Sequence, residues 1–379
     1  MHSIRPLLTH HLRLRPPPRL PHLLTPHDQK PYSSSPLPPP PLINPESYLA
    51  SARQKFVSQP PKIISATLTR SKADQLTLAL EDANPAFRQS HGEFEDGDPL
   101  PQGYHMVYFE PKISSYQPMA DGTDPYHFPG GPFARRMWVG GEVDFEREYM
   151  GCMLLGEGGK ETKAECREWV ESEGVEVKGG KVFVEVGREY FAVTGKEKVK
   201  VLTEKRRLVF LRPLEEELAR QVERLRLGDK KAVERKRIKV PWRPFFSFSL
   251  RPDAQFLSLF SVLTSNAHRI HLDSKYARVE EGYKDVLVHG PLTLVLMLEG
   301  LASYLHKSGK EKRRWIKSMS YRNLAPLFKG DEVRVCGALA KSQGRGEGEE
   351  EWVVWIEDFE GGLAVKGSAT VVGRQVMGS

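Results

Sequence analysis

Residues 256–305 read FLSLFSVLTSNAHRIHLDSKYARVEEGYKDVLVHGPLTLVLMLEGLASYL, a stretch in which a polar loop separates two apolar segments. In the first segment, four apolar residues recur at the spacing of one helical face: Phe256, Leu259, Phe260 and Leu263. Asp253 precedes them where an N-cap residue belongs, and residues 264–266, Thr-Ser-Asn, favour caps and turns. The pattern therefore predicts a short helix that ends just before the polar loop.

The polar loop concentrates side chains that are costly to bury. Residues 266–273 hold two histidines, an arginine, an asparagine and an aspartate around Ile270 and Leu272. Burying a polar group costs free energy unless the group is paired. We therefore predict a polar site at the edge of the hydrophobic core.

A His-Gly-Pro turn opens the second apolar segment, at residues 289–291. Gly290 permits a tight turn and leaves its N–H exposed, and Pro291 suits the first position of a helix. Residues 292–305 are apolar nearly all round, which predicts a buried helix. A buried helix that begins with a free glycine N–H is a suitable site for an oxyanion.

The loop and the turn together resemble the MaoC-like hydratase/dehydratase family of hot-dog folds. The family loop reads Asp-x-Asn-Pro-x-His and is followed by a His-Gly turn, whereas this loop reads Asn-x-His-Arg-Ile-His. His271 takes the position of the catalytic histidine, and Gly290 takes that of the oxyanion-hole glycine. Asn266 replaces the catalytic aspartate of the family, and His268 replaces its asparagine.

Two further segments place the resemblance in a narrower branch, the mitochondrial type 2 hydroxyacyl-thioester dehydratases and the related mesaconyl-CoA hydratases. Residues 321–328, YRNLAPLF, are similar to one signature of that branch. Residues 128–141, FPGGPFARRMWVGG, are similar to another, with Ala134 in place of a proline. The resemblance is strong over residues 240–375 and weaker over residues 45–220.

The resemblance implies an α+β protein with a tandem hot-dog fold. Each unit would wrap an antiparallel sheet around a central helix, and the two sheets would join edge to edge, which removes exposed strand edges. The predicted parts are a leader over residues 1–44, a degenerate hot-dog domain over 45–220, a basic linker over 221–241 and the catalytic MaoC-like domain over 242–379. Within the first domain we predict a strand at residues 104–109 and a helix in the middle of residues 156–180.

Residues 1–44 have the composition of a mitochondrial transit peptide. Four arginines alternate with leucine and histidine in a segment without acidic residues before Asp28: Arg5, Arg13, Arg15 and Arg19. The segment therefore predicts import into the mitochondrial matrix. The alternative is a disordered Pro-rich tail without a targeting role.

Composition excludes several other classes. The formal net charge is +7, and the basic run of residues 230–239 has no interleaved aromatics, which argues against a nucleic-acid partner. The three cysteines lie far apart, so they predict neither a disulfide framework nor a metal site. No uninterrupted apolar run reaches the roughly 18 residues that a membrane span needs. His268 and His271 lack a third ligand at a recognisable spacing, so we expect no metal and no cofactor.

Dehydration of a 3-hydroxyacyl thioester needs a base for the C2 proton, an acid for the departing C3 hydroxyl and a donor for the thioester oxygen. His271 is the predicted acid/base because histidine titrates near neutral pH. The N–H of Gly290 is the predicted oxyanion donor. Asn266 transfers no proton at ordinary pH and would orient the hydroxyl by hydrogen bonding. Either His271 shuttles both protons, or His268 or Asp273 shares the work.

Five residues are predicted to contact the substrate: His268, Asp273, His289, Arg135 and Arg136. Paired arginines between glycines suit a phosphate or a carboxylate, because guanidinium binds such groups bidentately. The alternative is a salt-bridged loop that packs Trp138 on the core. For His289, hydrogen bonding to the loop is the stronger expectation.

By this resemblance, the predicted activity is reversible loss of water from (3R)-3-hydroxyacyl thioesters of an acyl-carrier protein or CoA, within mitochondrial type II fatty-acid synthesis. A CoA-dicarboxylate hydratase of the mesaconyl-CoA type is the second enzymatic possibility, which Arg135, Arg136 or Arg269 would favour. The missing carboxylate would also suit a hot-dog thioesterase, and a chain without catalysis would be an acyl-binding scaffold. The tandem arrangement resembles a hot-dog dimer within one chain, so we expect a monomeric pseudo-dimer or a homodimer.

Overall fold

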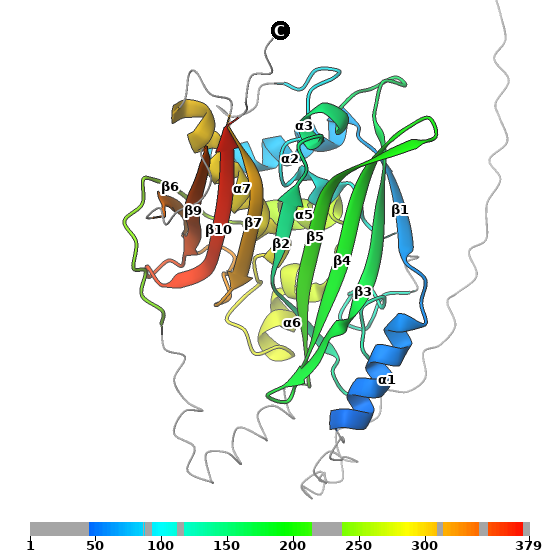
Figure 1. Ribbon diagram of the computed structural model, residues 1–379. Helices are drawn as coiled ribbons and strands as arrows, with labels where there is room; N and C mark the ends of the chain where they lie inside the picture. The colour runs from blue at the N-terminus through cyan, green and yellow to red at the C-terminus, as the bar shows by residue number, and fades with distance from the viewer. Residues whose placement is uncertain are drawn as a thin grey trace, which may run out of the picture. The chain divides into compact units, whose positions relative to one another are not determined.

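The computed structural model describes most of the chain after the predicted leader (Figure 1). The described residues are 45–85, 87, 93–111, 117–213, 237–308, 314–340 and 348–373. The leader of residues 1–44 and residues 221–236 of the predicted basic linker lie outside the described residues. All described residues belong to one unit, residues 43–379.

Ten strands form one sheet in which every pairing is antiparallel. The first half contributes β1 (Lys62–Thr67), β2 (Arg135–Phe145), β3 (Lys163–Lys178), β4 (Lys181–Thr194) and β5 (Glu197–Leu211). The second half contributes β6 (Phe246–Leu250), β7 (Arg314–Asn323), β8 (Val333–Leu339), β9 (Glu349–Glu357) and β10 (Leu363–Gly373). Their order in the sheet is β1-β3-β4-β5-β2-β7-β10-β9-β8-β6 (Figure 1).

The two halves repeat one topology. Read from its outer edge, the first half has its strands in the order first, third, fourth, fifth, second, and the second half has the same order. The halves meet where residues 140–144 of β2 pair with residues 318–322 of β7. Gly140 allows this join, since a Cβ there would lie 2.2 Å from the carbonyl oxygen of Tyr321. The repeat and the join confirm the predicted α+β tandem arrangement.

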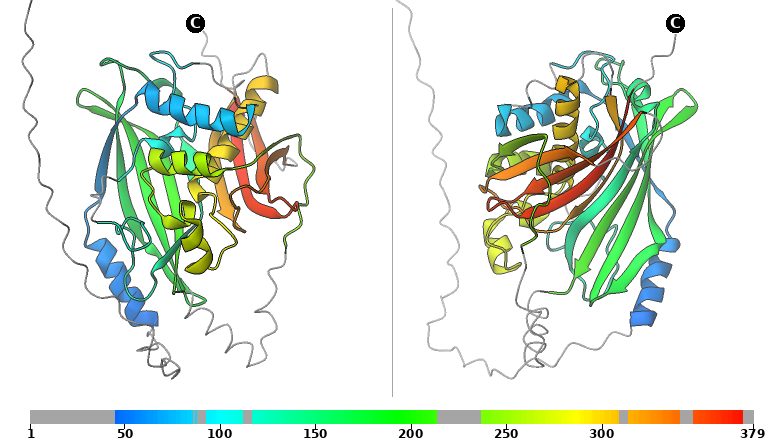
Figure 2. Two further views of the ribbon diagram at one scale, coloured as in Figure 1. Left: turned by 180° about the vertical axis from the view of Figure 1, so that it is seen from behind. Right: turned by 60° about the vertical axis from the view of Figure 1, so that its left-hand side comes forward.

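Several helices accompany the sheet. They are α1 (Pro45–Val57), α2 (Arg70–Ala83), the 3-10 helix η2 (Tyr104–Val107), α3 (Tyr149–Cys152), α5 (Ala254–Leu263), the 3-10 helix η4 (Arg269–His271), α6 (Ser274–Val279) and α7 (Gly290–Ser308). Seen from behind in Figure 2, α2, α5 and α7 lie in front of the sheet, while α1 covers the far end of β3. None of the helices in the described part of the chain is long and apolar enough to cross a membrane.

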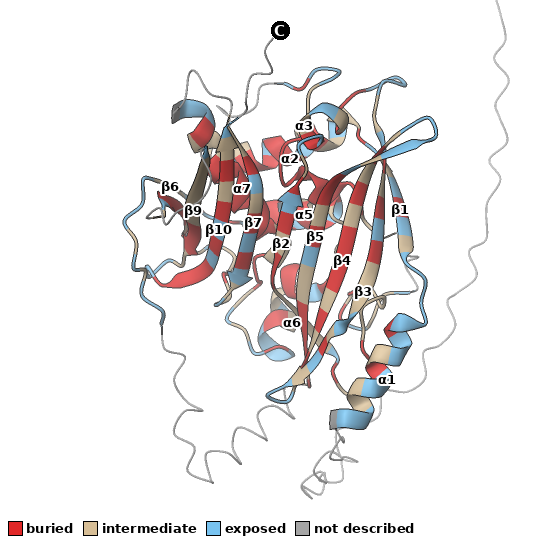
Figure 3. Cartoon of the chain, in the orientation of Figure 1, coloured by how far each residue is buried: buried red, intermediate tan, exposed pale blue. Residues whose placement is uncertain are grey.

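The helix α7 is the central helix of the second half. Residues 292–301 are buried without exception, as the red colour of α7 in Figure 3 shows. The helix packs against β7 and β8 and also contacts β6 and β9 of this half and β2 of the first half. The predicted buried helix is therefore confirmed, and its apolar circumference is explained by contact on every side.

The first half departs from two local predictions. Residues 104–109, predicted as a strand, contain the short helix η2, and all six are buried. The predicted helix within residues 156–180 is also wrong, since β3 occupies residues 163–178. Ala164, Cys166 and Glu168 face the interior at every second position, and β3 pairs with β1 on one side and β4 on the other. In the described part of the first half, η2 is a short buried helix that precedes β2, and it contacts α7.

Candidate active site

A cavity of about 180 Å³ lies where the two halves join. Both segments that resemble family signatures contribute to it, as does the loop with the two histidines. Its lining from the first half is Arg136, Met137, Trp138, Val139 and Leu208. Its lining from the second half is Asn266, His268, Ile270, His271, Leu287, Val288, Gly290, Pro291, Thr293, residues 323–327 and Val365. The first half therefore forms part of the wall of this cavity.

The histidine loop is held by the helix before it. Asp253 caps α5 by accepting the N–H of Phe256 at 2.8 Å, which confirms the predicted N-cap. The helix ends at Thr264, whose hydroxyl donates to the carbonyl of Phe260 at 2.6 Å. Ser265 then turns the chain with a left-handed φ of 48°, the only positive φ among the described non-glycine residues. This turn directs the next residues into the cavity.

His271 lies on η4 and presents one ring nitrogen for chemistry. Its Nδ1 lies 2.9 Å from the carbonyl oxygen of Leu287. A carbonyl only accepts, so Nδ1 carries the hydrogen and Nε2 of the neutral ring keeps its lone pair. Burial, together with the nearby Arg136, lowers the pKa of His271 to about 4 despite the bond to Leu287. The ring is therefore neutral at pH 7 and able to accept a proton.

His289 lies directly behind His271 and does not line the cavity. The two rings stack with centroids 3.8 Å apart and planes 23° apart. The Nε2 of His289 lies 2.8 Å from the hydroxyl of Ser261. Burial holds the pKa of His289 well below its usual range, and repulsion from His271 and His268 adds to the effect. His289 thus supports the ring of His271 from within the core.

Gly290 begins α7 and lines the cavity. Its N–H has no backbone partner among the described residues, as expected for the first turn of a helix. A Cβ at this position would lie 2.7 Å from Cβ of Trp138. Glycine is therefore required here by the close approach of β2, and not by a left-handed backbone.

A chain of hydrogen bonds fixes the start of α7 against both halves. The side chain of Asn323 donates to the carbonyl of Trp138 at 3.0 Å and accepts from the hydroxyl of Thr293 at 3.0 Å. The indole of Trp138 donates to the hydroxyl of Tyr321 at 2.7 Å. These residues lie in or beside the two signature segments and α7, yet the sequence alone did not indicate that they contact one another.

Asn266 and His268 both line the cavity. The side-chain oxygen of Asn266 accepts the backbone N–H of His268 at 3.2 Å. The ring of His268 is buried, with 4 % of the residue exposed, and its Nε2 lies 3.5 Å from Oδ2 of Asp121. Burial lowers the pKa of His268 well below its usual range, and nearby His271 and Arg136 add to the effect.

Asp121 was not singled out from the sequence. It is buried, with 6 % exposed, and its Oδ1 accepts from the N–H and the hydroxyl of Thr123 at 2.9 and 2.7 Å. Its Oδ2 has no hydrogen-bond partner in the described part of the chain. The next residue, Gly122, has a φ of 85°, and a Cβ there would lie 2.1 Å from the carbonyl oxygen of Ala267. In the sequence, the pair Asp121-Gly122 could have indicated this contact, because only glycine permits the backbone to approach Ala267 so closely.

The two adjacent arginines have different surroundings. Arg135 donates from Nε to the buried carboxylate of Glu281 at 2.6 Å and does not line the cavity. Arg136 does line it, and its Nη1 donates to Oδ2 of Asp124 at 2.7 Å. Nη1 also donates to the carbonyl oxygen of Asp124 at 3.4 Å, whereas Nε and Nη2 have no hydrogen-bond partner among the described residues. Burial alone would raise the pKa of Asp124, but Arg136 and His127 lower it to about 2.

Asp273, a predicted substrate contact, lies outside the cavity lining. Its side chain caps α6 by accepting the N–H groups of Lys275 and Tyr276. It also forms an ion pair of 2.9 Å with Arg269, which is exposed and lies over the ring of Tyr276. The structure therefore gathers five of the predicted site residues at the cavity: Asn266, His268, His271, Gly290 and Arg136.

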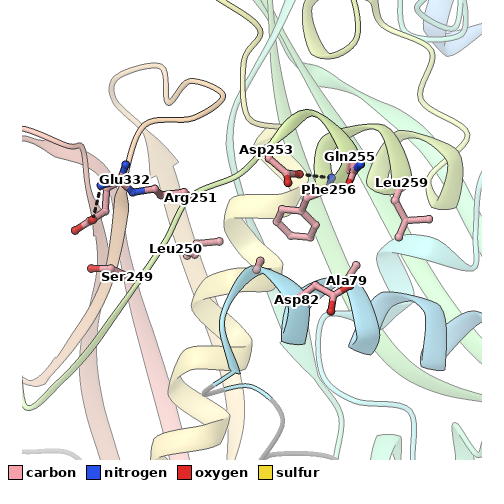
Figure 4. Close-up of a pocket in the computed structure, with 11 residues that line it drawn as sticks. Ala79, Asp82, Ser249, Leu250, Arg251, Asp253, Gln255, Phe256, Leu259 and Glu332 are labelled. Carbon is pink, nitrogen blue, oxygen red and sulfur yellow. Dashed lines mark hydrogen bonds and ion pairs between the residues drawn. The ribbon is translucent and has the colours of Figure 1, made fainter.

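A larger cavity of about 630 Å³ lies between α2, α5 and the end of β6 (Figure 4). Its charged lining residues are Asp82, Arg251, Asp253 and Glu332, of which Arg251 and Glu332 pair at 3.3 Å. No histidine lines it, and Asp253 is already used as the cap of α5. The smaller cavity is the better candidate for catalysis, because it combines acid–base groups with a helix N-terminus. Within the described ranges, no cluster of side chains suited to a metal ion occurs.

Comparisons with known proteins agree with this geometry. The chain is 31% identical over 232 residues to the mesaconyl-C(4)-CoA hydratase of Chloroflexus aurantiacus, covering 61% of this chain and 71% of that protein. It is 25% identical over 249 residues to the mitochondrial hydroxyacyl-thioester dehydratase type 2 of Schizosaccharomyces pombe, covering 62% and 77%. A MaoC-like dehydratase from Phytophthora capsici has the same fold, with a TM-score of 0.54 at 16% identity over 85% of this chain and 98% of that one.

The sequence profile of the hydroxyacyl-thioester dehydratase type 2 family matches residues 103–329. The chain, which has the MaoC-like tandem hot-dog fold, therefore belongs to this family of hydro-lyases.

Proposed function

We propose that this protein removes water reversibly from (3R)-3-hydroxyacyl thioesters to give trans-2-enoyl thioesters. The observation that carries the proposal is that the neutral ring of His271 and the first N–H of α7, at Gly290, border one cavity. A base and an oxyanion donor on one thioester are what the removal of a C2 proton requires.

In the dehydration direction, Nε2 of His271 takes the C2 proton. Negative charge then develops on the thioester oxygen, where the N–H of Gly290 and the positive end of the α7 dipole stabilise it. The stacked His289 and the bond to Leu287 hold the His271 ring in place, so little free energy is needed to orient the base. Asn266 is proposed to hydrogen-bond the hydroxyl group of the substrate.

The test is an assay of the purified protein with crotonyl-CoA. Loss of enoyl absorbance without release of free thiol is the expected result. Release of thiol would overturn the proposal in favour of a thioesterase. Absence of both changes would leave an acyl-binding scaffold.

A matched variant for this assay is His271→Asn. The amide nitrogen of Asn occupies nearly the position of Nδ1 and keeps a donor for Leu287, while the proton acceptor is removed. We expect kcat/KM to fall by about 10²–10⁴-fold with the fold intact, the range for loss of a general base. A variant that retains full activity would remove His271 from the mechanism.

A second candidate is hydration of an acyl-CoA that carries a free carboxylate. The observation that favours it is Arg136, which lines the cavity with N–H groups that no described residue accepts. The relative from C. aurantiacus is named for a hydratase activity on mesaconyl-C(4)-CoA. A largely buried arginine with free N–H groups at a cavity wall is suited to a carboxylate or a phosphate.

We further propose a role in mitochondrial type II fatty-acid synthesis, in the matrix, on acyl-carrier-protein or CoA thioesters. Two relatives, from Saccharomyces cerevisiae and S. pombe, are named as mitochondrial. The basic, acid-free residues 1–27 support the same proposal. Fusion of residues 1–44 to a fluorescent reporter tests the location, and a diffuse cytosolic signal would contradict it. Parallel assays on acyl-carrier-protein and CoA thioesters test the carrier.

A further inference from the structure

A dehydratase needs a second proton-transfer group, and the position that holds an aspartate in related loops holds Asn266 here. The cavity nevertheless lies next to a buried carboxylate from the other half of the chain. Oδ2 of Asp121 lies 3.5 Å from Nε2 of His268, and neither atom has a hydrogen-bond partner among the described residues. Two facing buried polar atoms without partners are costly, so the pair calls for an explanation beyond packing.

The carboxylate determines which nitrogen of His268 carries a hydrogen. A carboxylate accepts only, so the ring turns an N–H at Nε2 towards Oδ2 of Asp121. Because His268 lines the cavity, Nδ1 is then the ring nitrogen that can contact the substrate. Oδ1 of Asp121 is fixed by two bonds from Thr123, so the orientation of the carboxylate is set before substrate binds.

We propose that His268 is the catalytic residue that exchanges a proton with the C3 hydroxyl, and that Asp121 is the positioning residue that makes this exchange possible. The inference rests on the proposed function and assigns the acid–base role for which Asn266 is unsuited. Burial keeps the resting ring of His268 neutral, and the facing carboxylate of Asp121 offsets part of the cost when the ring takes up a proton. The same carboxylate holds the ring with Nδ1 towards the substrate. His268 and His271 then divide the two proton transfers, with ring centroids 5.5 Å apart.

The two rings account for every proton in the dehydration step. Nε2 of His271 takes the C2 proton, and the electron pair of that C–H bond forms the C2–C3 double bond. The C3–O bond breaks, its electrons leave with oxygen, and the oxygen takes a proton from Nδ1 of charged His268. Water departs, His271 is left protonated and His268 neutral, and exchange with solvent restores both rings.

A change of leaving group tests this division of labour. 3-Fluorobutyryl-CoA loses fluoride, which departs without a proton, whereas (3R)-3-hydroxybutyryl-CoA needs an acid at C3. Asp121→Asn keeps an oxygen for Thr123 and removes the charge. His268→Gln keeps an amide donor near the position of Nε2 and removes Nδ1.

We expect both variants to lose about 10²-fold or more in kcat with the hydroxy substrate, but less than about tenfold with the fluoro substrate. His271→Asn should lose activity with both substrates, because both need the base. The control Asp98→Asn alters a carboxylate that accepts the N–H of Glu95 and lines neither cavity, so its kcat should stay within about twofold of wild type.

Equal losses on the two substrates in Asp121→Asn and His268→Gln would overturn the inference, and so would unchanged kcat with the hydroxy substrate. In either case the proposed function would stand, because wild-type turnover establishes it separately. Wild-type protein that is inactive with hydroxyacyl and enoyl thioesters would overturn the proposed function, and this inference with it. Circular dichroism and melting temperature check that each variant is folded.

Discussion

The ring of His289 lies against the ring of His271 with centroids 3.8 Å apart and planes inclined by 23°. At this distance two charged imidazoles would repel each other strongly, and both rings are buried. The stack therefore favours neutral rings, in agreement with the lowered pKa of about 4 that burial gives His271. Neutrality keeps the lone pair of Nε2 available across the physiological pH range.

The first prediction concerns stability and pH. The folded pKa of His271, about 4, lies below its unfolded value of about 6.5, so the unfolded chain binds more protons between these values. The stability that this residue contributes is complete above about pH 6.5 and is lost as the pH falls towards 4. Urea unfolding at pH 7 and at pH 5 gives the change in the free energy of unfolding between these two pH values. We expect the free energy to fall by about 2 kcal/mol less in His271→Asn than in wild type.

The control for this comparison is Ser58→Ala, at an exposed residue whose side chain does not titrate. Its difference in stability between pH 7 and pH 5 should equal that of wild type. An unchanged difference in His271→Asn as well would show that His271 does not stay neutral in the folded protein.

A second prediction follows from the contact between β2 and the start of α7. In Gly290→Ala, the new Cβ meets Cβ and Cγ of Trp138 at 2.7 and 2.8 Å, so α7 or β2 must shift. Overpacking of this kind costs about 1–3 kcal/mol, and the shift moves the proposed oxyanion donor. We expect both a lower free energy of unfolding and a lower kcat.

Gly151→Ala is the matched control, since nothing lies within 4 Å of a Cβ at that helical glycine. Its stability and kcat should equal or slightly exceed those of wild type. If Gly290→Ala behaves in the same way as Gly151→Ala, the close approach of Trp138 does not constrain the site.

The interior of the first half holds buried ion pairs. Glu168 pairs with Arg188, and both are nearly fully buried. Glu204 pairs with Arg206 and bonds the hydroxyl of Tyr190. In the second half, by contrast, the central helix α7 contributes mostly apolar residues to the core. These pairs place charged side chains in the interior of the first half, where each charge is compensated by a buried partner.

The third prediction is that Glu168→Gln is strongly destabilising. It leaves the charge of Arg188 buried beside a neutral amide, which typically costs about 3–5 kcal/mol. Glu165→Gln on the same strand removes a partly exposed pair with Lys198 and should cost less than about 1 kcal/mol. Denaturant unfolding of both variants checks the difference. Equal costs would show that the interior pair is replaceable.

The features that the residue pattern predicted correctly depend on short-range spacing in the sequence. The cap at Asp253, the helix that ends at the histidine loop and the buried helix from Gly290 all follow from spacing within one element. The two units and the edge-to-edge join of their sheets came from the family resemblance, which carries information on long-range pairing. The strands that form the join, β2 and β7, were not predicted. The catalytic roles of His271 and Gly290 stay predictions.

What the sequence did not predict depends on contacts between distant segments or on competing local bonds. Asp121 approaches His268 only because the two halves of the chain fold against each other. Asp273 looked like a ligand beside the histidines, but an aspartate two or three residues before backbone N–H groups makes a helix cap instead. Residues 104–109 are buried on all sides, so their apolar run did not separate a strand from a short helix.

The last prediction distinguishes the acyl groups that the cavity accepts. Arg136→Gln removes the charge of a residue that lines the cavity and has unpaired N–H groups at Nε and Nη2 in the described part of the chain. A charge-assisted hydrogen bond is worth about 1.5–3 kcal/mol. We expect kcat/KM for an enoyl-CoA with a free carboxylate to fall at least about tenfold more than kcat/KM for crotonyl-CoA. Arg269→Gln is the control, because that arginine is exposed and paired with Asp273 outside the cavity. Equal losses on both substrates would instead indicate that Arg136 contacts the phosphate-bearing carrier that the two thioesters share, since only the acyl end differs between them.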